Sequence, residues 1–207
     1  KSLNDLGMCF MFAPNHHQLS PALAAARKEV GSPTIFNSLG PLCNPANAPF
    51  QLIGVYDRRL LAPTAAALAR LGTTRAWVVH GSDGLDELTL SGPTSVLEVS
   101  SDGVRPFKVC PYDFGVDASK AELPECLSAT DSADLIMSVL EGRPSSRHAA
   151  DVIKLNAAAA IFIAGAADTM RSAFEQAAES LESGAALSKL RQMSAATADE
   201  RSRSQSC

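Results

Sequence analysis

A run of carboxylates is the densest group of chemically active side chains in the sequence. Asp83, Asp86 and Glu87 lie within the stretch Asp-Gly-Leu-Asp-Glu, shortly after an apolar segment that ends at His80. Like charges this close together repel one another, and a bound cation offsets the repulsion. Magnesium suits such a loop, because it takes one or two carboxylates and fills its other positions with water and phosphate oxygens. The alternative is a solvated acidic turn, since Asp-Gly is a common turn pair.

Polar residues near the start of the chain form a second candidate site. Asn15, His16 and His17 follow an apolar run at 8–13 and Pro14. Neighbouring side chains of an extended chain point to opposite sides, and no further ligand has the spacing of a zinc site. A hydrogen-bonding role toward a small polar ligand, or plain loop structure, is therefore favoured over a metal site.

A basic residue follows on a predicted helix. The helix is expected over 20–30, because Ser20 can cap it and Pro21 is tolerated at its first position. A guanidinium pairs with a carboxylate through two hydrogen bonds, so Arg27 would select an anionic ligand if it faces a cleft. The pattern alone favours an ordinary surface charge, as for the adjacent Lys28.

The loop at 40–45 has a restricted backbone. Its sequence, Gly-Pro-Leu-Cys-Asn-Pro, contains one glycine and two prolines, including Pro41. Such rigid loops serve both as structural corners and as the walls of binding sites. No base or cation pattern surrounds Cys43, so we predict no nucleophile there.

Apolar segments and helices alternate through the first half of the chain, which is typical of a parallel α/β unit. Weaker strands separated by turn-forming pairs then indicate an antiparallel meander, and the remainder is helical in pattern. The expected strands are 8–13, 34–39, 50–56, 75–80, 89–90, 95–99 and 104–109, and the expected helices are 20–30, 63–71, 133–140, 149–164 and 170–193. We therefore predict an α/β fold with a central, largely parallel sheet flanked by helices, which binds its ligands beyond the strand ends.

The composition excludes several classes of protein. Hydrophobic residues make up 46% and charged residues 19% of the 207 residues, which is typical of a globular chain. A net charge of -4 and 5% aromatic residues argue against a nucleic-acid partner. No run approaches the roughly 20 apolar residues of a membrane span, so we predict no membrane partner. Five widely spaced cysteines favour reduced thiols inside a cell.

Seven segments, taken in order along the chain, resemble anthranilate phosphoribosyltransferases. They are Phe-Ala-Pro-Asn-His-His at 12–17, Ala-Arg-Lys-Glu-Val-Gly at 26–31, the stretch 34–46 around Gly-Pro-Leu-Cys-Asn-Pro, Gln-Leu-Ile-Gly-Val-Tyr at 51–56, 79–87, Leu-Asn-Ala-Ala-Ala-Ala at 155–160, and 183–190. The resemblance implies the nucleoside phosphorylase/phosphoribosyltransferase type of α/β fold. It makes 1–193 the C-terminal part of the α/β domain, with about 14–31 in a smaller helical domain. The polar stretch 194–207 is expected to be a disordered tail.

The resemblance also implies a reaction and its binding residues. Members transfer the phosphoribosyl group of phosphoribosyl diphosphate to the amino group of anthranilate and release diphosphate, a step of tryptophan biosynthesis. The residues implied for this chain are Asp86 and Glu87 as ligands of Mg²⁺, and Arg27, His17, Asn15 and Pro41 in the anthranilate site. Arg27 would contact the anthranilate carboxylate. No catalytic residue is assigned.

The sequence departs from the family's pattern upstream of these segments. A glycine-rich Gly-Thr-Gly-Gly-Asp loop, a Lys-His-Gly-Asn segment and a Ser-rich stretch are absent, as are the N-terminal helices through which members form homodimers. The resemblance therefore implies an incomplete domain that is weakly active or inactive alone. A pyrimidine nucleoside phosphorylase-like enzyme and a non-catalytic remnant of the fold are the alternatives. The expected location is the cytoplasm, or the plastid if the source is a plant or alga.

Overall fold

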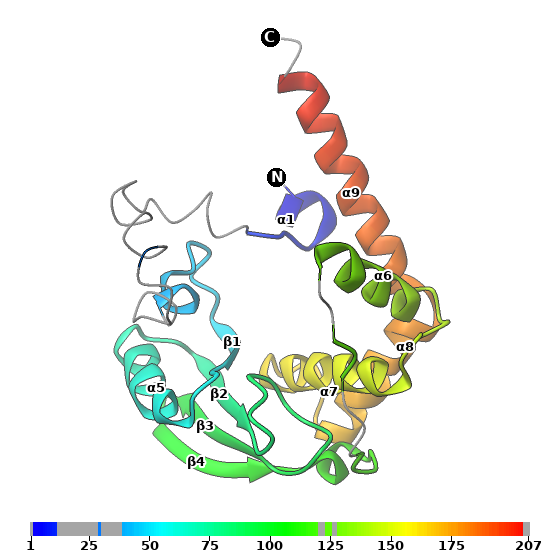
Figure 1. Ribbon diagram of the computed structural model, residues 1–207. Coiled ribbons are helices and arrows are strands. Elements are labelled where there is room, and N and C mark those ends of the chain that lie inside the picture. The colour runs from blue at the N-terminus through cyan, green and yellow to red at the C-terminus, as the bar shows by residue number, and fades with distance from the viewer. Residues whose placement is uncertain (1, 12–28, 30–38, 120–122, 126–127, 205–207) are drawn as a thin grey trace.

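The computed structural model describes residues 2–11, 29, 39–119, 123–125 and 128–204 (Figure 1). Side chains are described as far as residue 197. The elements are α1 (Ser2–Leu6), η1 (Pro41–Cys43), β1 (Phe50–Gly54), η2 (Arg58–Leu60), α5 (Leu61–Arg70), β2 (Arg75–Gly81), β3 (Thr94–Ser100), β4 (Gly103–Val109), η3 (Pro111–Phe114), α6 (Ala129–Leu140), α7 (Arg147–Ile163), α8 (Met170–Glu182) and α9 (Ala185–Ser204).

The described strands form one mixed sheet in the order β1-β2-β3-β4. β1 and β2 are parallel, because η2 and α5 carry the chain back to the start of the sheet between them. β2, β3 and β4 are successively antiparallel. The expectation of a largely parallel sheet is therefore wrong for the described residues. The loops after β2 and β3 contain no crossover helix, so each following strand must run in the opposite direction.

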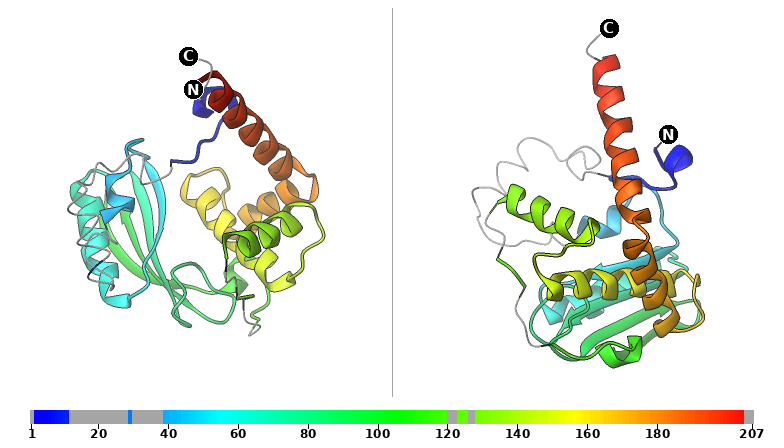
Figure 2. Two further views of the ribbon diagram at one scale, coloured as in Figure 1. Left: turned by 45° about the horizontal axis from the view of Figure 1, so that its top comes forward. Right: turned by 90° about the vertical axis from the view of Figure 1, so that its right-hand side faces the viewer.

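Helices cover both faces of the sheet. Alternate residues of β2 point to opposite faces, so Trp77 and Val79 join a core with α7 and α8. Ala76 and Val78 join a second core with α5 on the other face. Figure 2 shows α5 on one side of the sheet and α7 with α8 on the other. This three-layer arrangement confirms the predicted α/β class.

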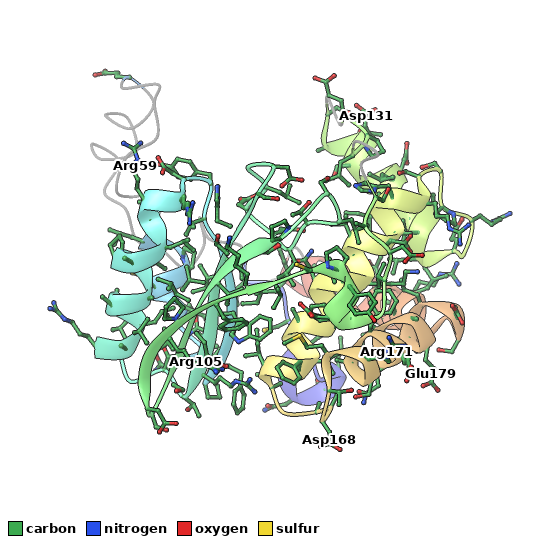
Figure 3. The ribbon with its side chains drawn as sticks, turned by 90° about the horizontal axis from the view of Figure 1, so that it is seen from below. Arg59, Arg105, Asp131, Asp168, Arg171 and Glu179 are labelled. Atoms are coloured by element: carbon green, nitrogen blue, oxygen red, sulfur yellow. The ribbon has the colours of Figure 1, made fainter. Side chains whose placement is uncertain are left out.

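A buried carboxylate joins the sheet to α7. Glu98 of β3 accepts hydrogen bonds from Arg75 Nε at 3.0 Å, Trp77 Nε1 at 3.1 Å and Arg105 at 2.7 Å. Arg75 also donates to the carbonyl of Phe162 at 3.2 Å, near the C-terminal end of α7. Figure 3 shows Arg105 on β4. The cluster therefore connects β2, β3, β4 and α7 through one glutamate.

Two of the expected strands are not strands in the structure. Residues 8–11 of the predicted strand 8–13 lie in no strand, and Phe10 is 75% exposed. An apolar run becomes a buried strand only between two neighbours, and the described sheet ends at β1. The second is 89–90, where Thr89 and Leu90 are buried but form no strand pairing. The N–H of Thr89 donates to the Thr94 hydroxyl, and the carbonyl of Leu90 accepts from the N–H of Ser119.

The predicted strands 50–56, 75–80, 95–99 and 104–109 and helices 63–71, 133–140 and 149–164 agree with the structure within a few residues, whereas nearly all of the predicted helix 20–30 and segment 34–39 lies outside the described residues. The predicted helix 170–193 is divided at Gly184, whose φ of 75° ends α8 in the left-handed region. α9 then continues to Ser204, where the sequence predicted a disordered tail. Alanine, arginine and glutamate favour helix, and the half-buried Leu187 and Leu190 hold its first turns. Its last turns project from the body (Figure 1). Among the described helices, none is long and apolar enough to cross a membrane.

Candidate active site

The loop that follows β2, residues 82–93 and here called the acidic loop, folds over the end of β1. The main chain of Asp86 lies against Gly54, the last residue of β1. A Cβ added at Gly54 would stand 1.5 Å from the Asp86 carbonyl oxygen and 2.5 Å from its carbonyl carbon. Glycine is therefore required here by the close approach of two backbones. The contact brings the carboxylates of the loop to the C-terminal end of the parallel strand pair.

Asp83 forms the turn of the acidic loop. Its carboxylate accepts hydrogen bonds from the Thr89 hydroxyl at 2.5 Å and from the N–H of Leu85 at 3.2 Å. The carbonyl of Leu85 in turn accepts from the N–H of Gly81 at 2.8 Å. Burial alone would raise the pKa of Asp83, but these hydrogen bonds outweigh it and lower the pKa. The carboxylate is thus occupied by the turn itself.

Asp86 and Glu87 are exposed beyond that turn, and neither forms an ion pair with a cationic side chain of the described residues. Partial burial of the Glu87 carboxyl raises its pKa, and the charge of Asp86 raises it further. A cation between the two would relieve that repulsion. The described residues contain no group of three or more side chains suited to a metal ion. Two carboxylates with open positions still fit Mg²⁺, which keeps most of its ligands as water or phosphate.

A pocket of about 380 Å³ lies over β1 beside η1. Pro41, predicted for the anthranilate site, lines it together with Met11 and with Leu52 and Ile53 of β1. Leu42 packs against the core beside α5 and holds the loop that carries Pro41. The lining is mixed apolar and amide, which suits a small planar ligand.

The pocket and the acidic loop both contact β1. Ile53 lines the pocket, and the next residue, Gly54, contacts Asp86. The other described lining residues, from Gly40 to Phe50, surround the start of β1, whereas the two free carboxylates lie beyond its C-terminal end. The predicted anthranilate residues Asn15, His17 and Arg27 lie outside the described residues. Met11, which lines the pocket, comes shortly before them in the chain.

Sequence reasoning missed three residues that shape this end of the sheet. Gly54 admits the acidic loop, and Asn156 of α7 bonds to the main chain of Leu88. His80 donates from Nδ1 to the carbonyl of Val55 at 2.8 Å and joins the ends of β1 and β2. Three sequence features could have pointed to them: a glycine and a histidine at the ends of predicted strands, and an asparagine within an alanine-rich helix.

Known proteins resemble the chain over most of its length. A family model described as "Glycosyl transferase family, a/b domain" matches residues 1–187. An anthranilate phosphoribosyltransferase of Nitrosomonas europaea is 45% identical over 190 residues, which is 92% of this chain and 55% of the relative. The chain thus spans about half the length of such relatives.

Solved structures show the same likeness. The anthranilate phosphoribosyltransferase of Thermus thermophilus superposes with a TM-score of 0.83 at 36% identity, over 94% of this chain and 57% of that one. The enzyme of Saccharomyces cerevisiae in complex with phosphoribosyl diphosphate and Mg superposes with a TM-score of 0.77 at 29% identity, over 91% and 53%. The same enzyme in complex with 4-fluoroanthranilate superposes with a TM-score of 0.77 at 29% identity, over 91% of this chain and 55% of that one. The resemblance read from the seven segments is confirmed.

Proposed function

We propose that this chain, which belongs to the glycosyl transferase family and carries its a/b domain, takes part in transferring a phosphoribosyl group from phosphoribosyl diphosphate to anthranilate. The observation that carries the proposal is the pair of free carboxylates, Asp86 and Glu87, which the acidic loop brings to the C-terminal end of the parallel strand pair. The relatives that match the chain bear the name of this activity. In the reaction, the bond between ribose C1 and diphosphate breaks, a bond from the amine nitrogen to C1 forms, and the amine loses one proton.

Asp86 and Glu87 would hold Mg²⁺ at the donor side. The yeast relative was crystallised with phosphoribosyl diphosphate and Mg, which supports a cation in this family. Bound magnesium supplies positive charge that offsets the negative charge on the departing diphosphate. Asp83 would take no part, since the turn already occupies its carboxylate.

The acceptor side would be the pocket at Pro41, completed by Asn15, His17 and Arg27. Arg27 would pair with the anthranilate carboxylate through its planar fork of donors. The yeast relative in complex with 4-fluoroanthranilate supports an aromatic acid as the acceptor. An aromatic amine is neutral and carries a lone pair, so positioning supplies much of the rate and no strong base is needed.

The whole reaction would need more than these residues. Because the chain spans 55% of its Nitrosomonas relative, we propose that the donor cradle comes from the part of the relatives that precedes this match. Backbone N–H groups of a glycine-rich loop would bind the diphosphate there. We further propose a homodimer for the complete protein and, from the bacterial relatives, a cytoplasmic location.

A joined protein tests the proposal. The chain would be fused after the upstream part of the Nitrosomonas europaea relative, and the loss of anthranilate fluorescence would be followed with phosphoribosyl diphosphate and Mg²⁺. We expect turnover that requires both substrates and falls at least about tenfold in Asp86→Asn with Glu87→Gln. Phosphate-dependent cleavage of pyrimidine nucleosides instead would favour the nucleoside phosphorylase alternative. No turnover of either kind by a folded fusion would favour the non-catalytic remnant.

A further inference from the structure

A single asparagine on α7 reaches across to the acidic loop. The Asn156 side-chain oxygen accepts from the N–H of Leu88 at 2.9 Å, and its amide nitrogen donates to the Leu88 carbonyl at 3.0 Å. The same nitrogen donates to the carbonyl of Val152, one turn earlier in the helix, at 3.0 Å. One side chain thus holds both main-chain polar groups of a buried residue and is itself oriented by its own helix.

These contacts act on Glu87, the residue before Leu88. A peptide unit is planar, so the bond to the Leu88 N–H fixes the unit that joins Glu87 to Leu88. The preceding unit, which joins Asp86 to Glu87, packs closely against Gly54 of β1 through the Asp86 carbonyl. The Cα of Glu87 therefore lies between a peptide unit packed against β1 and one hydrogen-bonded to α7.

We propose that Asn156 is a positioning residue for the divalent cation: by holding the main chain of Leu88, it keeps the Glu87 carboxylate beside that of Asp86. The inference rests on the proposed metal-binding role of those two carboxylates. Metal ligands depend on the partners that orient them, and loss of such a partner weakens metal binding about 10- to 100-fold.

The surroundings of Asn156 favour a specific role. Asparagine is a poor helix former, and α7 is otherwise rich in alanine and aliphatic residues. Its hydrogen bonds to the N–H and C=O of Leu88 offset this cost, because Leu88 is 1% exposed and its main-chain groups would otherwise lack these partners. A merely structural clamp would affect stability alone, whereas a positioning residue also affects cation affinity.

Binding of Mn²⁺ to the 207-residue chain, measured by electron paramagnetic resonance of the free ion, separates the two roles. The variants are Asn156→Ala and Asn156→Leu, the second of which keeps the side-chain volume without the hydrogen bonds. Gln176→Ala is the matched control, because its amide also donates to a main-chain carbonyl, that of Ala166 at 3.2 Å, but away from the loop. Asp86→Asn with Glu87→Gln defines binding that belongs to the carboxylates. Circular dichroism verifies folding, and hydrogen exchange follows the amide of Leu88.

We expect both Asn156 variants to bind Mn²⁺ about tenfold more weakly and to exchange the Leu88 amide faster. Gln176→Ala should keep the wild-type affinity within about twofold. Affinity within about twofold of wild type in folded Asn156→Leu, with faster exchange at Leu88, would overturn the inference and leave the metal site standing. If the carboxylate variant binds Mn²⁺ like wild type, the proposed metal site fails, and the inference fails with it.

Discussion

Gly54 is the residue at which the acidic loop and the sheet approach most closely. A methyl group there would stand 1.5 Å from the Asp86 carbonyl oxygen, and both partners are main chain. Neither can rotate away, so Gly54→Ala must shift β1 or the loop. We expect a loss of about 2 kcal/mol or more in the free energy of unfolding, measured in urea.

Gly92→Ala is the control for that substitution. Its new Cβ would meet only the Ser82 side chain, whose hydroxyl lies at 2.7 Å and can turn aside. The expected loss is below about 1 kcal/mol. Equal losses for the two variants would mean that the backbone approach at Gly54 is not what fixes the acidic loop.

The three acidic residues of the loop should divide into two roles. Asp83 bonds to Thr89 and Leu85, so Asp83→Asn should lower stability by about 1 kcal/mol with little change in the magnesium dependence of the fused enzyme. Asp86→Asn with Glu87→Gln should leave stability nearly unchanged and weaken the magnesium-dependent turnover of the fused enzyme. Raised magnesium should partly restore that turnover. Parallel unfolding and magnesium titrations decide between the two patterns. Greater loss of magnesium response in Asp83→Asn would assign the ligands differently.

Arg27 stays a prediction, because it lies outside the described residues. If it pairs with the anthranilate carboxylate, Arg27→Ala should raise the KM for anthranilate about 10- to 150-fold in the fused enzyme, the equivalent of about 1.5–3 kcal/mol. The KM for phosphoribosyl diphosphate should change little. Lys28→Ala is the control, since adjacent helical residues point about 100° apart. An equal effect from Lys28→Ala, or on both substrates, would make Arg27 an ordinary surface charge.

At the scale of elements, local pattern predicted most of the structure. The periodic strands 50–56 and 75–80 and the helix 63–71 are present nearly as expected, because each carries its own apolar pattern and turn signals. The antiparallel pairing of β3 with β4 confirms the meander that the turn-forming pairs indicated. The prediction of a largely parallel sheet failed because the acidic loop, and not a crossover helix, follows β2. The contacts of Gly54 with Asp86 and of Asn156 with Leu88 join distant segments, which no local pattern encodes.

The Glu98 cluster makes the sheet sensitive to acid. Burial alone would raise the pKa of Glu98, but the hydrogen bonds from Arg105, Trp77 and Arg75 outweigh it and lower the pKa. A lowered pKa means that the stabilisation is complete above the ordinary glutamate value of about 4.3 and is lost as pH falls through the folded-state value. Unfolding free energies between about pH 6 and pH 3 should therefore decrease, and Glu98→Gln should remove part of that decrease. The same pH dependence in both proteins would contradict the role given to the cluster.

At the scale of the molecule, the described residues form a sheet with helices on both faces. β1 has a pocket around its start and two free carboxylates beyond its end, features suited to an acceptor and to a cation. The match covers 55% of the Nitrosomonas protein, so the chain spans about half the length of such relatives. We propose that this chain holds the acceptor and cation sides of a phosphoribosyl transfer site whose donor cradle lies in the part of the relatives that the match does not cover.

The ratio of kcat/KM between the 207-residue chain and its fusion to the upstream part of the Nitrosomonas relative tests that claim most directly. Both proteins would be assayed with anthranilate, phosphoribosyl diphosphate and saturating Mg²⁺. We expect the fusion to turn over and the chain alone to fall more than about tenfold below it, because donor binding by backbone N–H groups is lost. Activity of the chain alone within about tenfold of the fusion, a difference of only about 1.4 kcal/mol in transition-state stabilisation, would contradict the claim.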